Sequence, residues 1–86
     1  MRYFLAKSFE KEFKKLPEKI RARAIKQLQI FVHNPMDPRL YNHALSGPLA
    51  NHRSIKITGD IRAHYVLVGE EIVRFVAIGP HSKLYK

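Results

Sequence analysis

The sequence contains no cysteine among its 86 residues. This absence excludes disulfide bonds and zinc sites built on thiolates. Because a secreted domain of this size often needs disulfides, we expect a protein of the reducing cytoplasm. No apolar run approaches the roughly 18 residues that span a bilayer, and the N-terminus lacks the apolar segment of a signal peptide. Together these absences favour a cytoplasmic protein that has no membrane partner.

Acidic residues are scarce: seven Asp and Glu stand against 16 Lys and Arg, which gives a net charge of +9 with the histidines neutral. That charge exceeds the roughly 2–8 that solubility alone suggests for a small domain. It speeds the encounter with polyanions or with an acidic protein, and it makes binding depend on salt. Nucleic acid is therefore the leading partner class, an acidic protein the second, and an anionic membrane a distant third.

The length predicts one domain over residues 1–86. A chain this short buries only roughly 60–65% of the surface that its unfolded form exposes, so its core is thin and its stability marginal. The sequence has no internal repeat and no low-complexity segment.

Local patterns predict two helices after a short strand over residues 1–6. Ser8 is suited to cap the first helix, in which apolar side chains recur at spacings of four and three from Phe9 to Leu16. Pro17 suits the first turn of a second helix. That helix keeps its apolar period until Asn34-Pro35 ends it. The result is a basic helical hairpin.

Three strands are predicted in the C-terminal half, after a turn-rich stretch over 34–52 with little regular structure. The apolar runs 53–57, 61–68 and 72–78 are separated by turns of hairpin length. The middle run alternates between an apolar face (Ile61, Ala63, Tyr65, Leu67) and a second face (Arg62, His64, Val66, Val68). The order β-α-α-β-β-β predicts an α+β fold, with the helices on one face of a small, mostly antiparallel sheet.

Four basic residues fall within the predicted sheet: Arg53, Lys56, Arg62 and Arg74. On a small twisted sheet they can converge into one cationic strip. A site that binds phosphate or cleaves RNA needs a cation where phosphate charge grows in the transition state. A single arginine on a strand is commonly just solvated, so it is the grouping that favours a functional strip.

His81, Lys83 and Tyr85 follow directly after an apolar strand that breaks at Gly79-Pro80. Because the pKa of an unperturbed histidine lies near 6.5, His81 is the leading candidate for proton transfer, against the alternative of an exposed histidine in a terminal turn. Tyr85 is suited either to stack on a base or to pin the tail to the core.

Two further residues are candidates for acid–base work. Asp60 either caps its own turn, as turn aspartates commonly do, or orients a histidine and accepts a proton. His43 lies in the irregular stretch and is suited either to loop packing or to a second acid–base or phosphate contact. His52 and His64 are weaker candidates. The histidines do not pair at metal-ligand spacing beside an acid, so neither a metal site nor a cofactor is expected.

Three motifs together resemble the RelE/ParE superfamily of bacterial type II toxins, and its YafQ branch above all. They are His43-x-Leu45-x-Gly47, the run from Arg53 to Tyr65, and the ending from Ile78 to Tyr85. Each motif is weak by itself, whereas the ordered set is fairly specific, and the likeness spans the whole chain. It departs at Ile61, where several such sequences have tryptophan, and at Lys56, where they tend to have histidine.

The resemblance implies an mRNA interferase that cuts the message in the ribosomal A site without a metal. The RNA 2′-hydroxyl would attack the neighbouring phosphate and leave a 2′,3′-cyclic phosphate and a 5′-hydroxyl. His81 would be the general acid, Asp60 or His43 would assist the base, and Arg62 would stabilise the phosphate. The remaining residues carried over would hold RNA: Arg53, Lys56, Arg74, Lys83 and Tyr85.

The resemblance also implies a cognate acidic antitoxin that covers the basic surface, to which the cationic segment 14–26 is suited. Three alternatives stay open. A ParE-like poison of DNA gyrase would need no acid–base histidine. A nucleic-acid-binding module without catalysis would give His81 no special role. A degenerate toxin would serve only to bind antitoxin.

Overall fold

The computed structural model describes residues 1–84, and these form a five-stranded mixed sheet with helices. The elements are β1 (Arg2–Leu5), α1 (Lys7–Lys14), α2 (Glu18–His33), η1 (Pro38–Leu40), β2 (His43–Ala44), η2 (Gly47–Leu49), β3 (His52–Lys56), β4 (Ile61–Gly69), β5 (Ile72–Pro80) and α3 (His81–Leu84), where η marks a 3-10 helix. The strand order is β1-β5-β4-β3-β2. β1 runs parallel to β5, and the other neighbours are antiparallel. The predicted α+β fold is confirmed.

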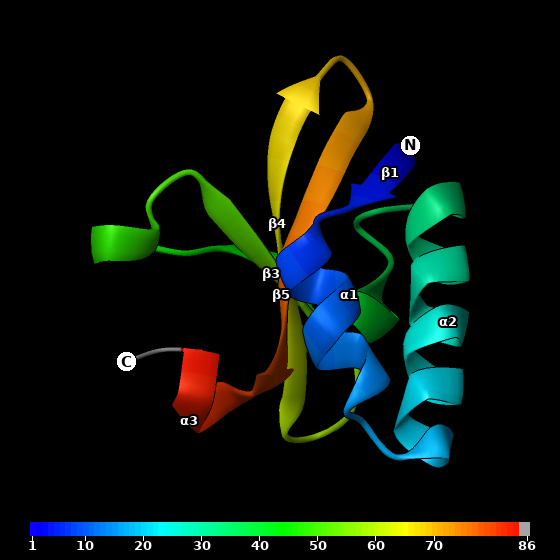
Figure 1. The fold of residues 1–86 in the computed structure, drawn as a ribbon. Coiled ribbons are helices and arrows are strands. Elements are labelled where there is room, and N and C mark those ends of the chain that lie inside the picture. The colour runs from blue at the N-terminus through cyan, green and yellow to red at the C-terminus, as the bar shows by residue number, and fades with distance from the viewer. Residues whose placement is uncertain (85–86) are drawn as a thin grey trace.

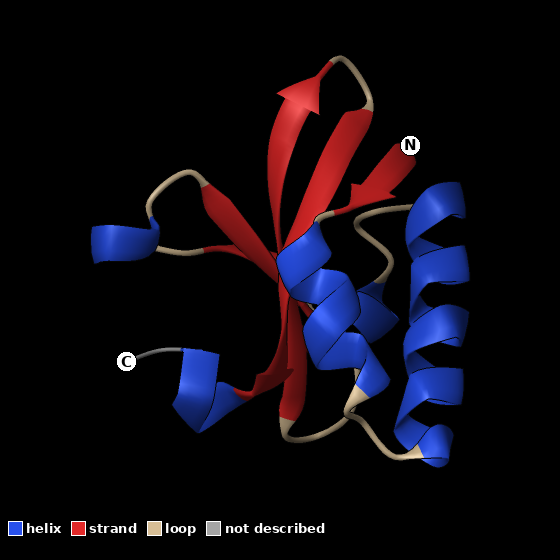
Figure 2. Cartoon of the chain, in the orientation of Figure 1, coloured by secondary structure: helices blue, strands red, loops and turns tan. Residues whose placement is uncertain are grey.

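The two faces of the sheet are covered differently. Figure 1 shows the sheet edge-on, with α1 and α2 on one side and α3 and η2 on the other. Within residues 1–84 the second side carries only these short helical turns, as the colouring of Figure 2 makes plain. We call the first side the helix face and the second the open face. No helix within residues 1–84 is long and apolar enough to cross a membrane.

The helical hairpin forms where the apolar pattern placed it. In α2 the buried side chains Ala24, Leu28 and Phe31 recur at spacings of four and three, which is one stripe of a helix. The helix begins directly after Pro17. It ends at His33, and Asn34 after it is extended because the proline that follows disfavours helical backbone before it.

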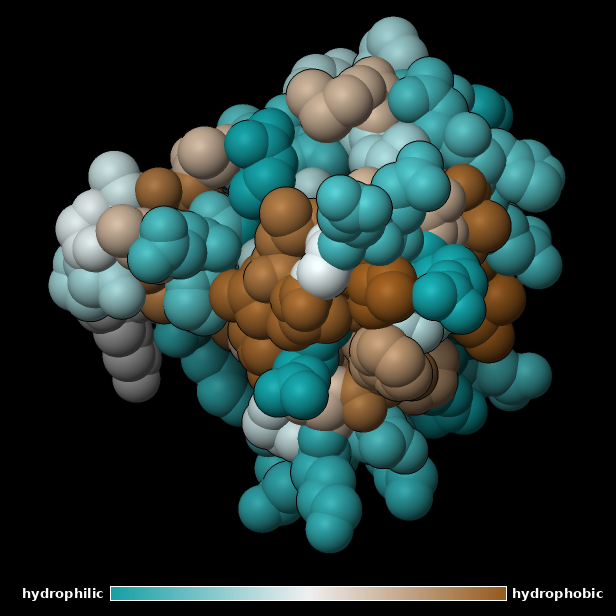
Figure 3. Space-filling model, turned by 90° about the horizontal axis from the view of Figure 1, so that it is seen from above, coloured by the Kyte–Doolittle hydropathy of each residue, from teal (hydrophilic) through white to brown (hydrophobic). Residues whose placement is uncertain are grey.

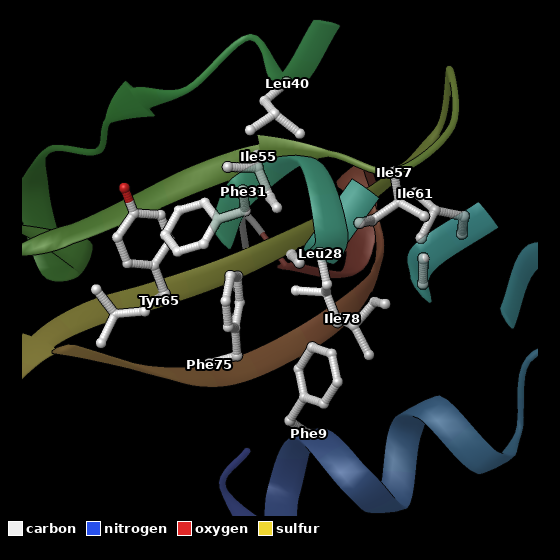
Figure 4. Close-up of a cluster of buried hydrophobic side chains, with 13 residues drawn as sticks. Phe9, Leu28, Phe31, Leu40, Ile55, Ile57, Ile61, Tyr65, Phe75 and Ile78 are labelled. Atoms are coloured by element: carbon white, nitrogen blue, oxygen red, sulfur yellow. The ribbon is translucent and has the colours of Figure 1, made fainter. Parts of the chain in front are cut away.

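The core fills the space between the hairpin and the helix face (Figure 4). Phe9 of α1 and Phe31 of α2 both pack on Phe75 at the centre of β5, with ring centroids 5.9 and 5.2 Å apart. Phe31 also meets Tyr65 of β4 edge-on at 5.0 Å. One aromatic cluster therefore ties both helices to the two central strands.

Ser8 does not cap the first helix as expected. Ala6 occupies the cap position, and the Ser8 hydroxyl instead donates to the Val76 carbonyl at 2.7 Å. The register explains this: His64 pairs with Ala77 and Tyr65 with Phe75, so Val76 lies in a bulge with no partner on β4. A side-chain donor from α1 satisfies the carbonyl there.

The turn-rich stretch contains more regular structure than expected. β2 is a two-residue strand whose His43 and Ala44 pair with Ser54 and Arg53. Two residues are too few to show a period in sequence, so the fifth strand could not be predicted.

The alternation predicted for β4 decides which residues share a face, but it does not decide which of them are buried. Leu67 belongs to the apolar face but is 67% exposed, because the β4–β5 hairpin projects beyond the helices (Figure 1). It joins other exposed apolar side chains, including Phe4, Val32 and Val68, and apolar residues gather on that end of the molecule (Figure 3). His64 belongs to the second face, as predicted, but it is buried, with only 2% of its surface exposed.

Candidate functional site

The open face carries most of the polar side chains that the sequence singled out. Directly opposed residues of neighbouring strands place their side chains on the same face. Ile55, Ala63 and Ile78 pair across β3, β4 and β5 and are buried, so they define the helix face. The alternate positions define the open face: His43, His52, Ser54, Lys56, Arg62, His64 and Arg74.

A row of two cations crosses one end of the open face. Lys56 of β3 lies directly opposite Arg62 of β4, and both side chains are half-buried. The Arg62 guanidinium donates to the Thr58 carbonyl at 2.7 Å, which holds it against the β3–β4 turn. The Lys56 ammonium lies 4.8 Å from the centroid of the Tyr41 ring. Two positive charges thus lie side by side at the edge where the turn and α3 begin, and the guanidinium of Arg62 is held in place by its hydrogen bond.

Arg74 extends the cationic strip along the same face. It lies on β5 opposite Val66 and next to β1, and its side chain is exposed. Three of the four basic residues predicted for the strip therefore share the open face. Arg53 does not, because it pairs with Tyr65 and lies on the helix face, where its Nε donates to the Asn42 side chain at 2.8 Å.

Histidines fill the middle of the open face. His43, Ser54 and His64 stand in one row across β2, β3 and β4, and His52 lies one row further along. Burial, and to a smaller extent positive charge on His52, His43 and His81, lowers the pKa of His64 to about 4. His64 is therefore neutral at cellular pH.

The burial of His64 is a feature of the site that the sequence did not reveal. Its place among the alternating residues of β4 was predicted, but its burial was not, because α3 and the neighbouring strands pack against β4 only in the folded chain. The alternation of β4 was the one available signal, since it puts His64 on the same face as Arg62.

Asp60 and His81 meet at the end of the sheet beside Arg62. The His81 backbone amide donates to the Asp60 carbonyl at 2.9 Å, so the start of α3 is bonded to the β3–β4 turn. Both side chains are exposed. The turn is capped by Thr58, whose hydroxyl accepts from the amides of Asp60 and Ile61 at 3.3 and 3.0 Å. Within residues 1–84 the Asp60 carboxylate makes no hydrogen bond or ion pair, and it is available for other work.

The last two predicted residues fare differently. Lys83 is exposed, and its ammonium pairs with the Glu12 carboxylate at 3.2 Å, which ties α3 to α1 and lowers the pKa of Glu12. Tyr85 lies outside the described residues. Ile61, where the resemblance expects an aromatic, is 6% exposed and belongs to the core.

The arrangement provides what phosphate chemistry requires. Arg62 and Lys56 offer fixed positive charge, while His81 and His43 are exposed and Asp60 offers an unengaged carboxylate. Such groups can neutralise a phosphate and exchange protons with its oxygens. Within the described part of the chain, no three His, Asp or Glu side chains come together as a metal site.

Comparison with known proteins extends the resemblance. The family model described as "ParE toxin of type II toxin-antitoxin system, parDE" matches residues 3–85. No curated protein matches the chain in sequence.

Among solved structures, the chain is similar to YafQ from E. coli BL21(DE3), at 18% identity and a TM-score of 0.82, with 100% of each chain covered. It is similar to a copper-bound mutant toxin from Helicobacter pylori, at 28% identity and a TM-score of 0.69, with 99% of each chain covered. It is also similar to a chain of the E. coli DinJ-YafQ toxin-antitoxin complex, at 19% identity and a TM-score of 0.76, with 98% and 96% covered.

Proposed function

Because the chain belongs to the ParE toxin family of type II toxin-antitoxin systems, within the RelE/ParE superfamily, we propose that it is a ribosome-dependent mRNA interferase of the YafQ type. It would act in the cytoplasm as a single domain, cut mRNA in the ribosomal A site and so inhibit translation. The observation that carries this proposal is the convergence of Lys56, Arg62, Asp60 and His81 at one end of the open face. A protein that only bound DNA gyrase would not need proton-transfer groups beside a cationic row.

In the proposed reaction the RNA 2′-hydroxyl attacks the adjacent phosphorus. Its proton passes to Asp60 or His43, and the P–O5′ bond breaks as His81 protonates the leaving 5′-oxygen. The products are a 2′,3′-cyclic phosphate and a 5′-hydroxyl. Arg62 and Lys56 stabilise the charge that grows on the phosphate oxygens during this exchange. Each proton that enters or leaves has a named group on the open face, and the scheme routes no step through a metal.

Arg74 would hold the RNA backbone further along the open face. We do not assign Arg53 to RNA, because its guanidinium is engaged with Asn42 on the other face. Lys83 is paired with Glu12 at the surface. It would contact RNA either after this ion pair breaks or while the pair remains intact. The active protein is proposed to need a cognate acidic antitoxin as its inhibitor, in keeping with the net charge of +9.

A second candidate function is poisoning of DNA gyrase, and the observation that favours it is the match to the ParE family model itself. It predicts inhibition of supercoiling that persists when His81 is replaced. Replacing His81 therefore distinguishes the two functions, because it should abolish mRNA cleavage and leave inhibition of gyrase intact.

The test is primer extension on a defined message in a reconstituted translation system. Wild type should give new 5′ ends in register with A-site codons. His81→Gln should lose cleavage by about 10²–10⁴-fold, because it removes the proton donor. His33→Gln is the matched control, since His33 is an exposed histidine at the far end of α2, and it should cut like wild type.

Two outcomes would contradict the proposal. Full-rate cleavage by His81→Gln would remove His81 from the role of acid. Intact message with every protein, together with inhibition of gyrase by wild type and by His81→Gln alike, would replace the interferase with the gyrase poison.

A further inference from the structure

Tyr41 is an exposed aromatic residue in an unusual backbone conformation. Its side chain is 66% exposed, and its φ and ψ angles of 47° and 45° lie in the left-handed region. Bulky residues rarely adopt that region, and strained positions of this kind cluster at binding and active sites. A tyrosine placed there for packing would be buried, and this one is not.

The chain on both sides of Tyr41 is anchored to the core. Leu40 is fully buried, and the Asn42 amide donates to the Tyr65 hydroxyl at 2.7 Å and to the Pro35 carbonyl at 2.9 Å. Arg53 in turn donates to the Asn42 oxygen. These anchors leave the backbone at residue 41 little freedom. The exposed ring is therefore presented by a fixed segment and not by a loose loop.

The same anchoring sets Tyr41 beside the cationic row. Buried Gln27 of α2 donates to the Lys56 carbonyl at 2.9 Å and to the Arg39 carbonyl at 3.2 Å, so β3 and the segment before Tyr41 are held to one another. The Lys56 ammonium rests over the Tyr41 ring at 4.8 Å from the centroid. His43 of the open face lies with its Nδ1 2.9 Å from the Tyr41 carbonyl oxygen. An exposed aromatic surface thus adjoins the groups that would hold phosphate.

We propose that Tyr41 is a base-stacking residue, which holds the base of an RNA nucleotide whose phosphate lies against Lys56 and Arg62. The inference rests on the proposed function for the identity of the ligand as RNA. Aromatic side chains beside a cationic groove are the usual means of holding single-stranded bases, because every base has a face that can stack. Lys56 covers part of the ring and would link the base-binding and phosphate-binding parts of the site.

The test measures binding, so that its outcome does not depend on cleavage. The probe is a single-stranded 2′-O-methyl RNA, which lacks the attacking hydroxyl and cannot be cut by the proposed reaction. It is compared with versions in which one nucleotide at a time is abasic. Tyr41→Asn removes the ring, while asparagine tolerates left-handed backbone and should preserve the fold, which a thermal melt checks. Tyr41→Phe keeps the ring.

Tyr41→Asn should bind the intact RNA about 5- to 150-fold more weakly than wild type, and Tyr41→Phe should bind like wild type. One of the abasic RNAs should bind wild type more weakly than intact RNA does, by the same factor. Tyr41→Asn should bind that abasic RNA and the intact RNA with equal affinity, because the ring and the missing base form one contact. Ile25→Gln is the control. Ile25 is a large apolar residue, 51% exposed on α2 on the other side of the sheet, and its removal should not change RNA affinity.

Affinity of Tyr41→Asn within twofold of wild type would overturn the inference. So would additivity at every position, in which the loss of affinity from Tyr41→Asn and the loss from each abasic nucleotide simply add. Failure of wild type to bind the RNA would overturn it as well. Absence of cleavage on the ribosome would refute the proposed reaction but leave the binding result to decide the role of Tyr41.

Discussion

At the residue scale, burial decides how the histidines of the open face behave. His43 and His81 are exposed, whereas His64 is covered and neutral, and its pKa of about 4 lies well below the ordinary value of 6.5. A proton on His64 would have to enter a buried position close to His43, His52 and His81. We therefore assign proton transfer to the exposed histidines and a structural role to His64, as a buried residue of the surface that carries them.

This difference predicts how stability depends on pH. Between pH 6.5 and about 4 the unfolded chain protonates His64 and the folded chain does not. The contribution of neutral His64 to the free energy of unfolding is therefore fully present above pH 6.5 and is lost as the pH falls. The loss should reach about 3 kcal/mol near pH 4. Urea unfolding of His64→Leu should show a weaker dependence on pH across this window, whatever its stability at neutral pH.

Asp37 titrates in a separate pH range, because hydrogen bonds from Arg39 lower its pKa to about 2. Its contribution to stability is lost only below its ordinary pKa of 3.8.

For the His64→Leu experiment, His33→Gln, at an exposed position, is the control and should follow wild type. Parallel curves for wild type and His64→Leu would show that His64 protonates freely in the folded state.

At the scale of elements, Gln27 connects three segments that carry the site. It is 1% exposed on α2, and its amide donates to one carbonyl at the end of β3 and to another in η1. A buried polar residue between two backbone carbonyls fixes their relative position as an apolar residue could not. We regard it as the reason that the cationic row and the segment of Tyr41 stay aligned.

Gln27→Leu should destabilise the protein by about 2–4 kcal/mol, because it leaves two carbonyls near the core without a donor. The free energy of unfolding in urea measures this effect. Gln29→Leu on the exposed side of the same helix is the control and should stay within about 0.5 kcal/mol of wild type. A similar stability for the two variants would mean that water replaces the Gln27 amide.

At the scale of the whole molecule, the net charge of +9 is divided between two surfaces. Lys56, Arg62 and Arg74 lie on the open face, while the lysines and arginines of α1 and α2 lie on the other side of the sheet (Figure 1). Under the proposed function the open face meets RNA, and the helical hairpin is left free for an acidic partner. Salt dependence can separate the two surfaces.

Arg74→Gln should weaken binding of single-stranded RNA and reduce the slope of log affinity against log salt by about 0.7, the value for one lost phosphate contact. Titrations at several salt concentrations give this slope. Lys26→Gln, at an exposed position on α2, is the matched control and should leave the slope unchanged. The reverse result, with the slope lowered only by Lys26→Gln, would move the RNA to the helical hairpin.

The sequence by itself determined the helices α1 and α2, the strands β1, β3, β4 and β5, and their order along the chain. The apolar period of α2, its stop at Asn34-Pro35 and the three C-terminal runs are local signals, each of which depends only on residues close together in sequence. That Lys56, Arg62 and Arg74 share one face could also be predicted, because strand alternation decides which residues lie on which face.

Only the tertiary structure decided which of these groups are free to act. Arg53 is turned to the helix face by its register with Tyr65, and His64 is buried by elements distant in sequence. Tyr41 gained its place beside Lys56 through Gln27, which lies on a helix well upstream. Register, burial and long-range hydrogen bonds depend on how the elements pack, so a local sequence pattern could not reveal them.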